Sequence, residues 1–178
     1  MIVVFSPMTT AETVSFDLHV SYRQAYLIDY GRIVTEFPDD HPEYPVGIIR
    51  VKDNNALLVT GLHTGIVGFT VMVADHDPGA DTDGYEDVVE ISFRSEIGCL
   101  WLCEWAGERV HDLPELPSGP GWYRLRYHAV NMDEGAEVNT SLDVVVDRYL
   151  LQIWPQAAST PSVVKGTSHQ LAYWRSEG

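Results

Sequence analysis

The sequence predicts an all-β, mainly antiparallel fold: a β-sandwich of about nine strands with a short C-terminal helix, with a β-barrel as the alternative. Apolar and polar residues alternate with a period of two along much of the chain. Segments rich in glycine, proline and asparagine separate these runs at short intervals. Amphipathic helix patterns are scarce, and the best covers residues 167–174, where Thr167 or Ser168 would cap a helix.

The alternating runs are predicted to be strands with one face in a core and the other in water. In one of them, residues 123–128, the side chains of Arg124, Arg126 and His128 fall on the face predicted to meet water. Other runs are apolar on both faces, which is typical of central or doubly covered strands. The nine predicted strands lie at residues 16–20, 26–30, 47–52, 56–60, 66–74, 89–94, 100–105, 123–128 and 149–154.

Turn signals divide these strands. The Asp-Asn-Asn sequence at residues 53–55 predicts a hairpin between the two runs that flank it. Residues 117–121 combine two prolines with two glycines and predict a sharp break. Residues 32–37 carry a weak helix pattern, and the three prolines of residues 38–45 predict an irregular loop. Two longer acidic loops are expected, at residues 75–87 and 131–143.

The length of 178 residues suits one hydrophobic core. We expect a loosely ordered leader at residues 1–13 and a single β-sandwich domain at residues 14–178. No targeting signal is apparent, and no apolar run approaches the roughly 20 residues that span a membrane. Cys99 and Cys103 would lie about 13 Å apart along a strand, which is too far for a disulfide. Free thiols of this kind suggest a reducing, cytoplasmic location.

The charge of the chain is strongly negative. It has 26 Asp and Glu against 11 Lys and Arg, for a formal net charge of −15. Such a chain repels nucleic acid and anionic membranes, because contacts with phosphates need Lys or Arg. It attracts basic protein surfaces and speeds encounters with them. The same charge could also serve solubility alone.

Catalytic motifs are absent from the sequence. It contains no GxSxG, GxxxxGK[ST], GxGxxG or HExxH pattern. Acidic pairs that are adjacent in sequence point to opposite faces of a strand, so they do not converge for glycoside hydrolysis. An enzyme would therefore need a site assembled from dispersed residues. This is the third of three functional hypotheses for the chain; the other two, a metal- or ligand-binding module and a protein-binding inhibitor, follow below.

The acidic loop at residues 75–87 and the strand after it are the most specific local signal. Four of their carboxylates fit ligand positions of the twelve-residue calcium-loop template, and Gly84 fits the turn, but Gly79 stands where the first carboxylate belongs. The second reading is thus a module that binds a divalent cation such as Ca²⁺, or a small ligand. Its candidate metal ligands are Asp81, Asp83, Asp87 and Glu90.

The first reading makes the same loop a contact surface for a basic protein, because clustered carboxylates repel one another until something cationic neutralises them. A solvated loop without a partner is the remaining alternative. The candidate contact residues are Asp75, Asp77, Asp81, Asp83, Glu86 and Asp87, with a second patch at Asp39, Asp40 and Glu43.

Four segments together resemble the bacterial competence nuclease-inhibitor family, the DNA-entry nuclease inhibitor and its relatives. They are residues 20–26 (Val-Ser-Tyr-Arg-Gln-Ala-Tyr), Tyr85-Glu86-Asp87 before the strand at 88–93, residues 117–125 from Pro117 to Leu125, and residues 147–155 from Asp147 to Pro155. The resemblance covers roughly residues 14–155, and it includes neither most of the acidic loop nor residues 156–178.

This resemblance implies a β-sandwich that binds and inhibits a nuclease or a toxin, and it implies no catalytic residue. A nuclease site is basic because it holds phosphates, so an acidic surface could occupy it as a nucleic-acid mimic. The leading expectation is therefore a non-enzymatic, cytoplasmic inhibitor or immunity-type protein that binds a basic protein and neither nucleic acid nor membrane.

Overall fold

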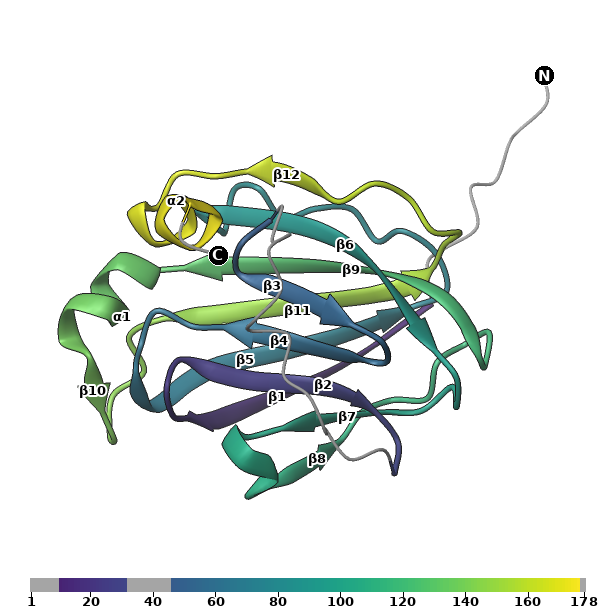
Figure 1. Ribbon diagram of the computed structural model, residues 1–178, viewed down its shortest axis with the longest axis horizontal. Helices are drawn as coiled ribbons and strands as arrows, with labels where there is room; N and C mark the ends of the chain where they lie inside the picture. The colour runs from purple at the N-terminus through teal and green to yellow at the C-terminus, as the bar shows by residue number, and fades with distance from the viewer. Residues whose placement is uncertain (1–9, 32–45, 177–178) are drawn as a thin grey trace.

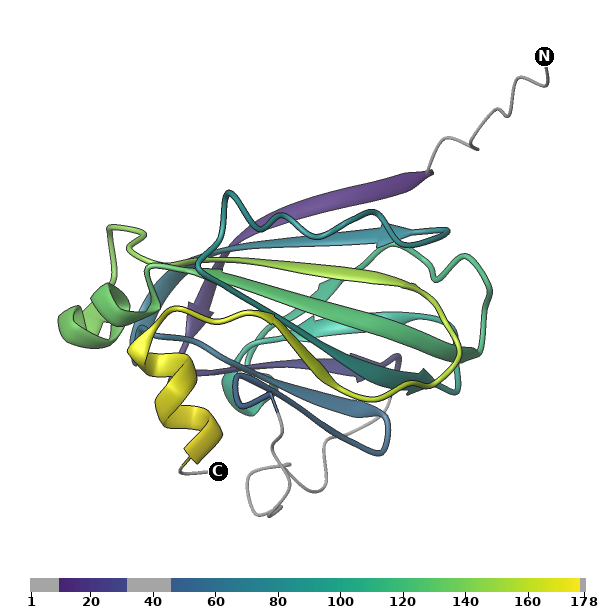
Figure 2. The ribbon, with the colours of Figure 1, turned by 90° about the horizontal axis from the view of Figure 1, so that it is seen from above.

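The computed structural model describes residues 10–31 and 46–176, which form two β-sheets packed over one core (Figures 1 and 2). The large sheet has the strand order β1-β5-β11-β9-β6-β12, and β10 pairs with the start of β5. Its strands are β1 (Ala11–Val20), β5 (Thr64–Ala74), β6 (Asp87–Ser95), β9 (Gly121–Val130), β10 (Thr140–Ser141), β11 (Arg148–Pro155) and β12 (Ser162–Lys165).

The small sheet has the order β3-β4-β2-β7-β8, and all of its pairs are antiparallel. Its strands are β2 (Gln24–Asp29), β3 (Ile49–Lys52), β4 (Asn55–Val59), β7 (Leu100–Cys103) and β8 (Val110–Asp112). In the large sheet, β11 and β10 run parallel to β5, and the other pairs are antiparallel.

Alternate residues of the two sheets fill the core between them. Phe69, Tyr127 and Tyr149 come from three neighbouring strands of the large sheet and are almost fully buried. The rings of Tyr127 and Tyr149 are stacked, with centroids 5.4 Å apart and an interplanar angle of 15°. Burial of each large apolar side chain stabilises the fold by about 1.5–3 kcal/mol. Leu27 and Leu58 face them from the small sheet.

All nine predicted strands are present, and residues 53–55 turn between β3 and β4 as predicted. The predicted C-terminal helix is α2 (His169–Ser176). The sandwich is confirmed and the barrel alternative is wrong, because neither sheet closes on itself. Residues 131–143 are not simply a loop: they form helix α1 (Met132–Val138) and strand β10. The short strands β8 and β12 and the 3₁₀ turn η2 (Trp105–Gly107) were also not predicted.

Two predicted segments lie partly or wholly outside the described residues. Residues 11–13, placed in the leader by the sequence, are the first three residues of β1 and pair with β5. The rest of that leader up to residue 9 lies outside the described residues, as do the weak helix pattern at residues 32–37 and the proline-rich loop at residues 38–45.

The outer face of β9 in the large sheet is not open to water, so the prediction that this face of residues 123–128 meets water is wrong. Arg124 and Arg126 are 3% and 5% exposed, and His128 is fully buried. The acidic loop follows this face on the side away from the small sheet (Figure 2). The chain between β11 and β12 covers the part next to it.

Within residues 10–31 and 46–176, no helix is long and apolar enough to cross a membrane. Cys99 and Cys103 are free thiols. Burial raises the pKa of the Cys103 thiol to about 12, so this side chain stays protonated at neutral pH.

Candidate functional site

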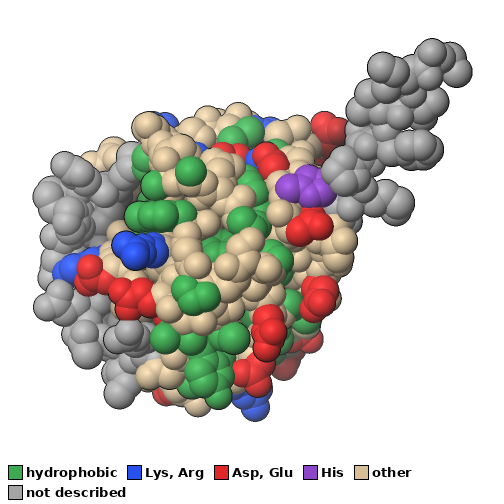
Figure 3. All heavy atoms as spheres, turned by 90° about the vertical axis from the view of Figure 1, so that its right-hand side faces the viewer, with side chains coloured by type: hydrophobic (Ala, Val, Ile, Leu, Met, Phe, Trp, Pro, Cys, Tyr) green, Lys and Arg blue, Asp and Glu red, His purple; other side chains and the backbone are tan. Residues whose placement is uncertain are grey.

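The predicted contact carboxylates of the acidic loop differ in their exposure. Asp75, Asp77, Asp81 and Asp83 are exposed, Glu86 is half-buried, and Asp87 is fully buried. Asp75 lies at the end of β5, where carboxylates gather along one side of this end of the sandwich (Figure 3). The second predicted patch, Asp39, Asp40 and Glu43, lies outside the described residues.

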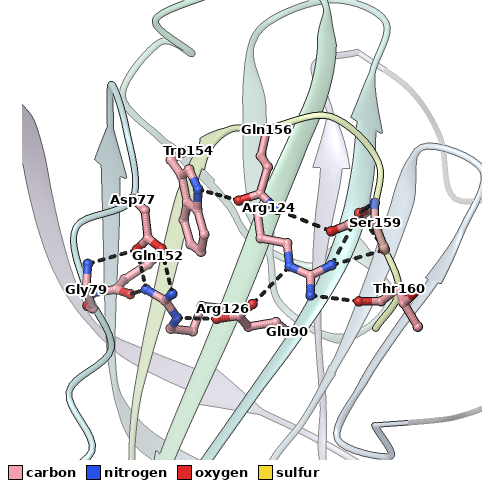
Figure 4. A network of polar contacts seen from close by, with 11 residues as sticks. Asp77, Gly79, Glu90, Arg124, Arg126, Gln152, Trp154, Gln156, Ser159 and Thr160 are labelled. Carbon is pink, nitrogen blue, oxygen red and sulfur yellow. Dashed lines mark hydrogen bonds and ion pairs between the residues drawn. The ribbon is translucent and has the colours of Figure 1, made fainter. Parts of the chain in front are cut away.

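Arg126 holds the acidic loop against the large sheet (Figure 4). Its guanidinium donates to both carboxylate oxygens of Asp77, at 2.8 and 3.1 Å, and to Oε1 of Glu90 at 2.7 Å. It also donates to Oε1 of Gln152 at 2.9 Å and lies 4.5 Å from the ring centroid of Trp154. Hydrogen bonds from Arg126 lower the pKa of Asp77, against an opposing effect of burial. Asp77 is thus neutralised within the molecule, although its side chain is half exposed.

Arg124 forms the second half of this network (Figure 4). Its Nε donates to Oε2 of Glu90 at 3.1 Å, so Glu90 is shared by two arginines. Its other nitrogens donate to the carbonyl oxygens of Ser159 and Thr160, at 3.2 and 2.9 Å. One carboxylate therefore ties together β6, β9 and the segment that leads into β12.

His128 fixes the middle of the acidic loop. Its Nε2 accepts a hydrogen bond from the backbone N–H of Asp81 at 3.1 Å, and its Nδ1 donates to the carbonyl oxygen of Leu150 at 3.1 Å. This pattern requires the neutral imidazole, because only one ring nitrogen carries a proton. Burial lowers the pKa of His128, which favours the same form. Gln152 holds the loop as well, since its amide donates to the carbonyl oxygen of Gly79 at 2.9 Å.

The end of the acidic loop holds the C-terminal part of the chain. The Oδ1 atom of Asp87 accepts hydrogen bonds from the backbone N–H groups of Thr167 and Ser168, at 2.9 and 3.1 Å. Lys165 donates to two carbonyl oxygens of the loop at 2.7 and 2.8 Å. These contacts position the start of α2. Asp87 is therefore a structural carboxylate and, being buried, does not form part of an open contact surface.

The four predicted metal ligands do not converge. The carboxylate of Asp87 is directed at the C-terminal segment. The carboxylate of Glu90 is directed at Arg124 and Arg126. The carboxylate of Asp81 accepts a hydrogen bond from the backbone N–H of Gly84 at 2.8 Å. In the described parts of the chain, no three His, Cys, Asp or Glu side chains are grouped so that they could hold a metal ion. The calcium-loop spacing in the sequence has no counterpart in this geometry.

A groove of about 360 Å³ lies on the large sheet beside the acidic loop. Its floor includes Gly68, which is paired with Asp17 of β1 on one side and with Arg148 of β11 on the other. Neither of these charged side chains is ion-paired with a described residue, and two strand spacings, about 10 Å, separate their backbones. Tyr85 lines the groove as well, and burial raises its pKa.

The acids lie in a loop, as predicted, but the residues of β9 that bind this loop were not predicted. Arg124, Arg126 and His128 alternate along β9 opposite a segment rich in carboxylates. The alternation of three basic side chains on one face of a central strand could have predicted these contacts. A buried charge needs a partner, so basic residues on a covered strand indicate that acidic residues pack over them.

No protein-family model matches the chain, and no curated protein matches its sequence. Among solved structures, "ComJ, inhibitor of the DNA degrading activity of NucA, from Bacillus subtilis" superposes with a TM-score of 0.54 at 16% identity, over 83% of this chain and 98% of ComJ. A protein described as "Crocagin biosynthetic gene J" gives a TM-score of 0.53 at 15% identity, over 83% of this chain and 99% of its own. The resemblance predicted from the sequence is thereby confirmed for the fold: the chain has the β-sandwich architecture of ComJ.

Proposed function

We propose that this protein is a non-enzymatic, inhibitor-type binding protein whose partner is a basic protein, a DNA-degrading nuclease or a toxin. The observation that carries the proposal is the fold shared with the nuclease inhibitor ComJ along 98% of the ComJ chain. The net charge of −15 points to the same class of partner, because a site that holds phosphates must be basic.

The exposed carboxylates supply the means of recognition. Asp81 and Asp83 are exposed, and neither is ion-paired with any residue that the structure describes. Carboxylates in a loop that is held against a rigid sheet attract a basic nuclease surface without the ordering cost of a flexible tail. The proposal places this encounter in the cytoplasm, where Cys99 and Cys103 stay reduced.

The test is inhibition of DNA degradation. The purified chain is titrated into the DNA-degrading nuclease encoded nearest to its own gene, and cleavage of supercoiled plasmid is followed on gels. We expect stoichiometric inhibition, a complex visible by isothermal titration calorimetry, and weaker binding as salt rises to about 0.5 M, where exposed charges are screened. ComJ with NucA serves as the positive control. Unimpaired cleavage together with no heat of binding would contradict the proposal.

A second candidate function is binding of a small polar ligand in the groove over Gly68. Its volume lies in the range of ligand pockets, and its opposite walls carry one acid and one base, Asp17 and Arg148. A ligand with charges of both signs, such as a free amino acid, fits that pattern. Thermal-shift measurements with the twenty amino acids test it: a shift that Arg148→Met abolishes and Arg94→Met preserves supports this function, and no shift with any of them rejects it.

A further inference from the structure

Four exposed apolar side chains mark the end of the sandwich where α1, β10 and the turn between β1 and β2 meet (Figure 1). Val144 is 64% exposed, Tyr22 58%, Leu142 57% and Val138 49%. The first three are the most exposed large apolar side chains of the described chain. We name these four residues the β10-end patch. Apolar side chains gathered at the surface mark interaction sites more often than single ones do.

The backbone contacts of Asn139 bring the parts of the patch together. The N–H groups of His63 and Thr64 both donate to the carbonyl oxygen of Asn139, at 3.0 and 3.1 Å. The guanidinium of Arg23 donates to its side-chain oxygen at 3.5 Å. The ring of Tyr22, next to Arg23, lies 5.4 Å from that of His63. The β1–β2 turn and the segment after α1 therefore form one continuous surface.

The patch is held in a fixed conformation. A Cβ atom on Gly65 would lie 1.8 Å from the carbonyl oxygen of Ser141, so only glycine lets β10 approach β5 this closely. The hydroxyl of Ser141 donates to the carbonyl oxygen of Val144 at 2.6 Å. The side-chain amide of Asn131 donates to the backbone carbonyl oxygen of Val146 at 3.2 Å. Because these contacts fix the loop in advance, docking would require little loss of conformational entropy.

The turn that presents Tyr22 is strained. Tyr22 and Arg23 both have positive φ angles, 56° and 62°, in a hairpin turn whose central positions normally hold Asn and Gly. Asn139 has a φ of 64°. Non-glycine residues in this region cost about 1 kcal/mol or more each, and such strain is concentrated at functional sites. A tyrosine in this position is well suited to a contact, since tyrosines are enriched among the residues that dominate interface energy.

The charge around the patch defines its partner. Residues 131–147 contain five Asp or Glu and no Lys, Arg or His. Glu134, Glu137 and Asp143 among them are exposed. An apolar centre with a rim of carboxylates matches a basic protein surface with an apolar depression, and it would repel an anionic membrane. Glu86 links this end to the acidic loop, because its carboxylate accepts from the N–H of Asn131 at 3.1 Å.

The opposite end of the sandwich also carries apolar side chains beside carboxylates (Figure 3). Its large exposed residues, Ile97 and Trp122, are 44% and 45% exposed. The guanidinium of Arg94 lies 6.0 Å from the ring centroid of Trp122, so a positive charge stands at that surface. A basic partner would meet this charge there. In the β10-end patch, the cation beside Tyr22 is Arg23, and its guanidinium is bonded within the molecule to the carbonyl oxygen of Gly61 and to the side chain of Asn139. Arg148, which follows residues 131–147, lines the groove over Gly68.

We infer that the β10-end patch is the surface on which the basic partner docks. Tyr22, Leu142 and Val144 enter an apolar depression of the partner, while Glu137 and Asp143 pair with Lys or Arg residues around it. This inference rests on the proposed function and adds to it the contact surface and the chemistry of the partner's site.

The test compares two double variants that leave the net charge unchanged. Leu142→Ser with Val144→Ser removes the centre of the patch, and Ile97→Ser with Val164→Ser removes exposed apolar side chains elsewhere. The probe is the purified nuclease encoded nearest to the gene of this chain. We expect the first variant to weaken binding at least about tenfold, and the second to change it less than about twofold, by calorimetry. Circular dichroism and thermal melting establish that both variants are folded.

The possible failures have different signatures. If the wild type binds and the Leu142→Ser, Val144→Ser variant binds equally well, the docking inference is overturned and the proposed function stands. If the wild type neither binds nor inhibits, the proposed function is overturned and the docking inference with it. A wild-type dimer in sedimentation velocity that the same variant dissociates would assign the patch to a second copy of this chain and also overturn the inference.

Discussion

The two acidic segments, residues 75–87 and 131–147, share an acidic composition but have different surroundings in the structure. Both are rich in carboxylates, and both lack Lys and Arg. The first is laid along the large sheet, where Arg126 binds Asp77 and the backbone of Thr167 and Ser168 binds Asp87. The second leaves Leu142 and Val144 exposed beside free carboxylates.

The difference teaches that the density of acids alone does not identify a contact surface. A carboxylate opposite a buried arginine contributes to folding, and only the remainder is available to a partner. Free carboxylates speed association, whereas apolar side chains in the centre of an interface supply most of its affinity. We therefore expect Asp81 and Asp83 of the first segment to speed association with the partner, and the apolar side chains of the second segment to supply most of the affinity.

The largest effect expected is on folding, from Arg126→Met. This change removes the cation of Asp77, leaves Glu90 with Arg124 alone and takes one hydrogen bond from the buried Gln152, so we expect the free energy of unfolding to fall by about 3 kcal/mol. Urea denaturation measures it. Arg148→Met, on an exposed arginine of the neighbouring strand, is the matched control and should leave the urea midpoint near that of the wild type. A wild-type midpoint for Arg126→Met would mean that the first segment is not a structural element.

The next effect concerns the second segment. Gly65→Ala forces β10 away from β5, and we expect a loss of about 2 kcal/mol together with faster amide hydrogen exchange at residues 138–146. Gly79→Ala is the control, because Gly79 also has a positive φ but has open space around it. Its cost should be only the backbone term of about 1 kcal/mol. Equal costs for the two variants would show that the close approach of β10 is unimportant.

A smaller effect is a dependence of stability on pH through His128. Its pKa is lowered in the folded state, so the unfolded chain binds more protons between the folded pKa and the ordinary value near 6.5. Stability is therefore fully present above about pH 6.5 and declines as the pH falls below it, by at most about 1.4 kcal/mol per pH unit. Unfolding free energies measured at intervals between pH 7.5 and 5.5 test this. The decline should be reduced in His128→Gln, whose amide oxygen can still accept from the N–H of Asp81.

The smallest effect expected is kinetic and separates the two segments directly. Asp81→Asn with Asp83→Asn should slow association with the basic partner a few-fold at low salt and leave its dissociation unchanged. The Leu142→Ser, Val144→Ser variant should do the reverse and raise the dissociation rate. Surface plasmon resonance at two salt concentrations resolves both. Faster dissociation of the Asp81→Asn, Asp83→Asn variant would contradict the proposal that these two carboxylates affect association alone.

Much of the fold was predictable because a period of two reports directly on a sheet with one apolar face. The alternating strands were found this way, the other main strands as apolar runs between turn signals, and α2 from its cap and its helical pattern. The short strands β8, β10 and β12 have two to four residues each, too few for periodicity to register, and they form because a longer neighbour offers an open edge. Helix α1 was missed because its seven residues include a glycine and few apolar positions.

The site was less predictable, for a physical reason. Whether Asp77 is a free charge or half of an ion pair depends on Arg126, which is 49 residues further along the chain. The sequence around Asp77 does not show that the fold brings these two side chains into contact. The alternation of Arg124, Arg126 and His128 was read as a water-exposed face because a strand pattern does not show what covers it. The exposure of Leu142 and Val144 was equally hard to predict, because apolar residues in a sequence are assigned to a core by default.

The strand order of the two sheets also determines when each can form during synthesis. All five strands of the small sheet lie between residues 24 and 112, whereas β5 must wait for β11 at residues 148–155. At a translation rate of about 5–20 residues per second, one edge of the eleven-residue strand β5 stays open for several seconds after it leaves the ribosome. During that interval the nascent chain presents an apolar strand edge, at which another chain could pair and start aggregation.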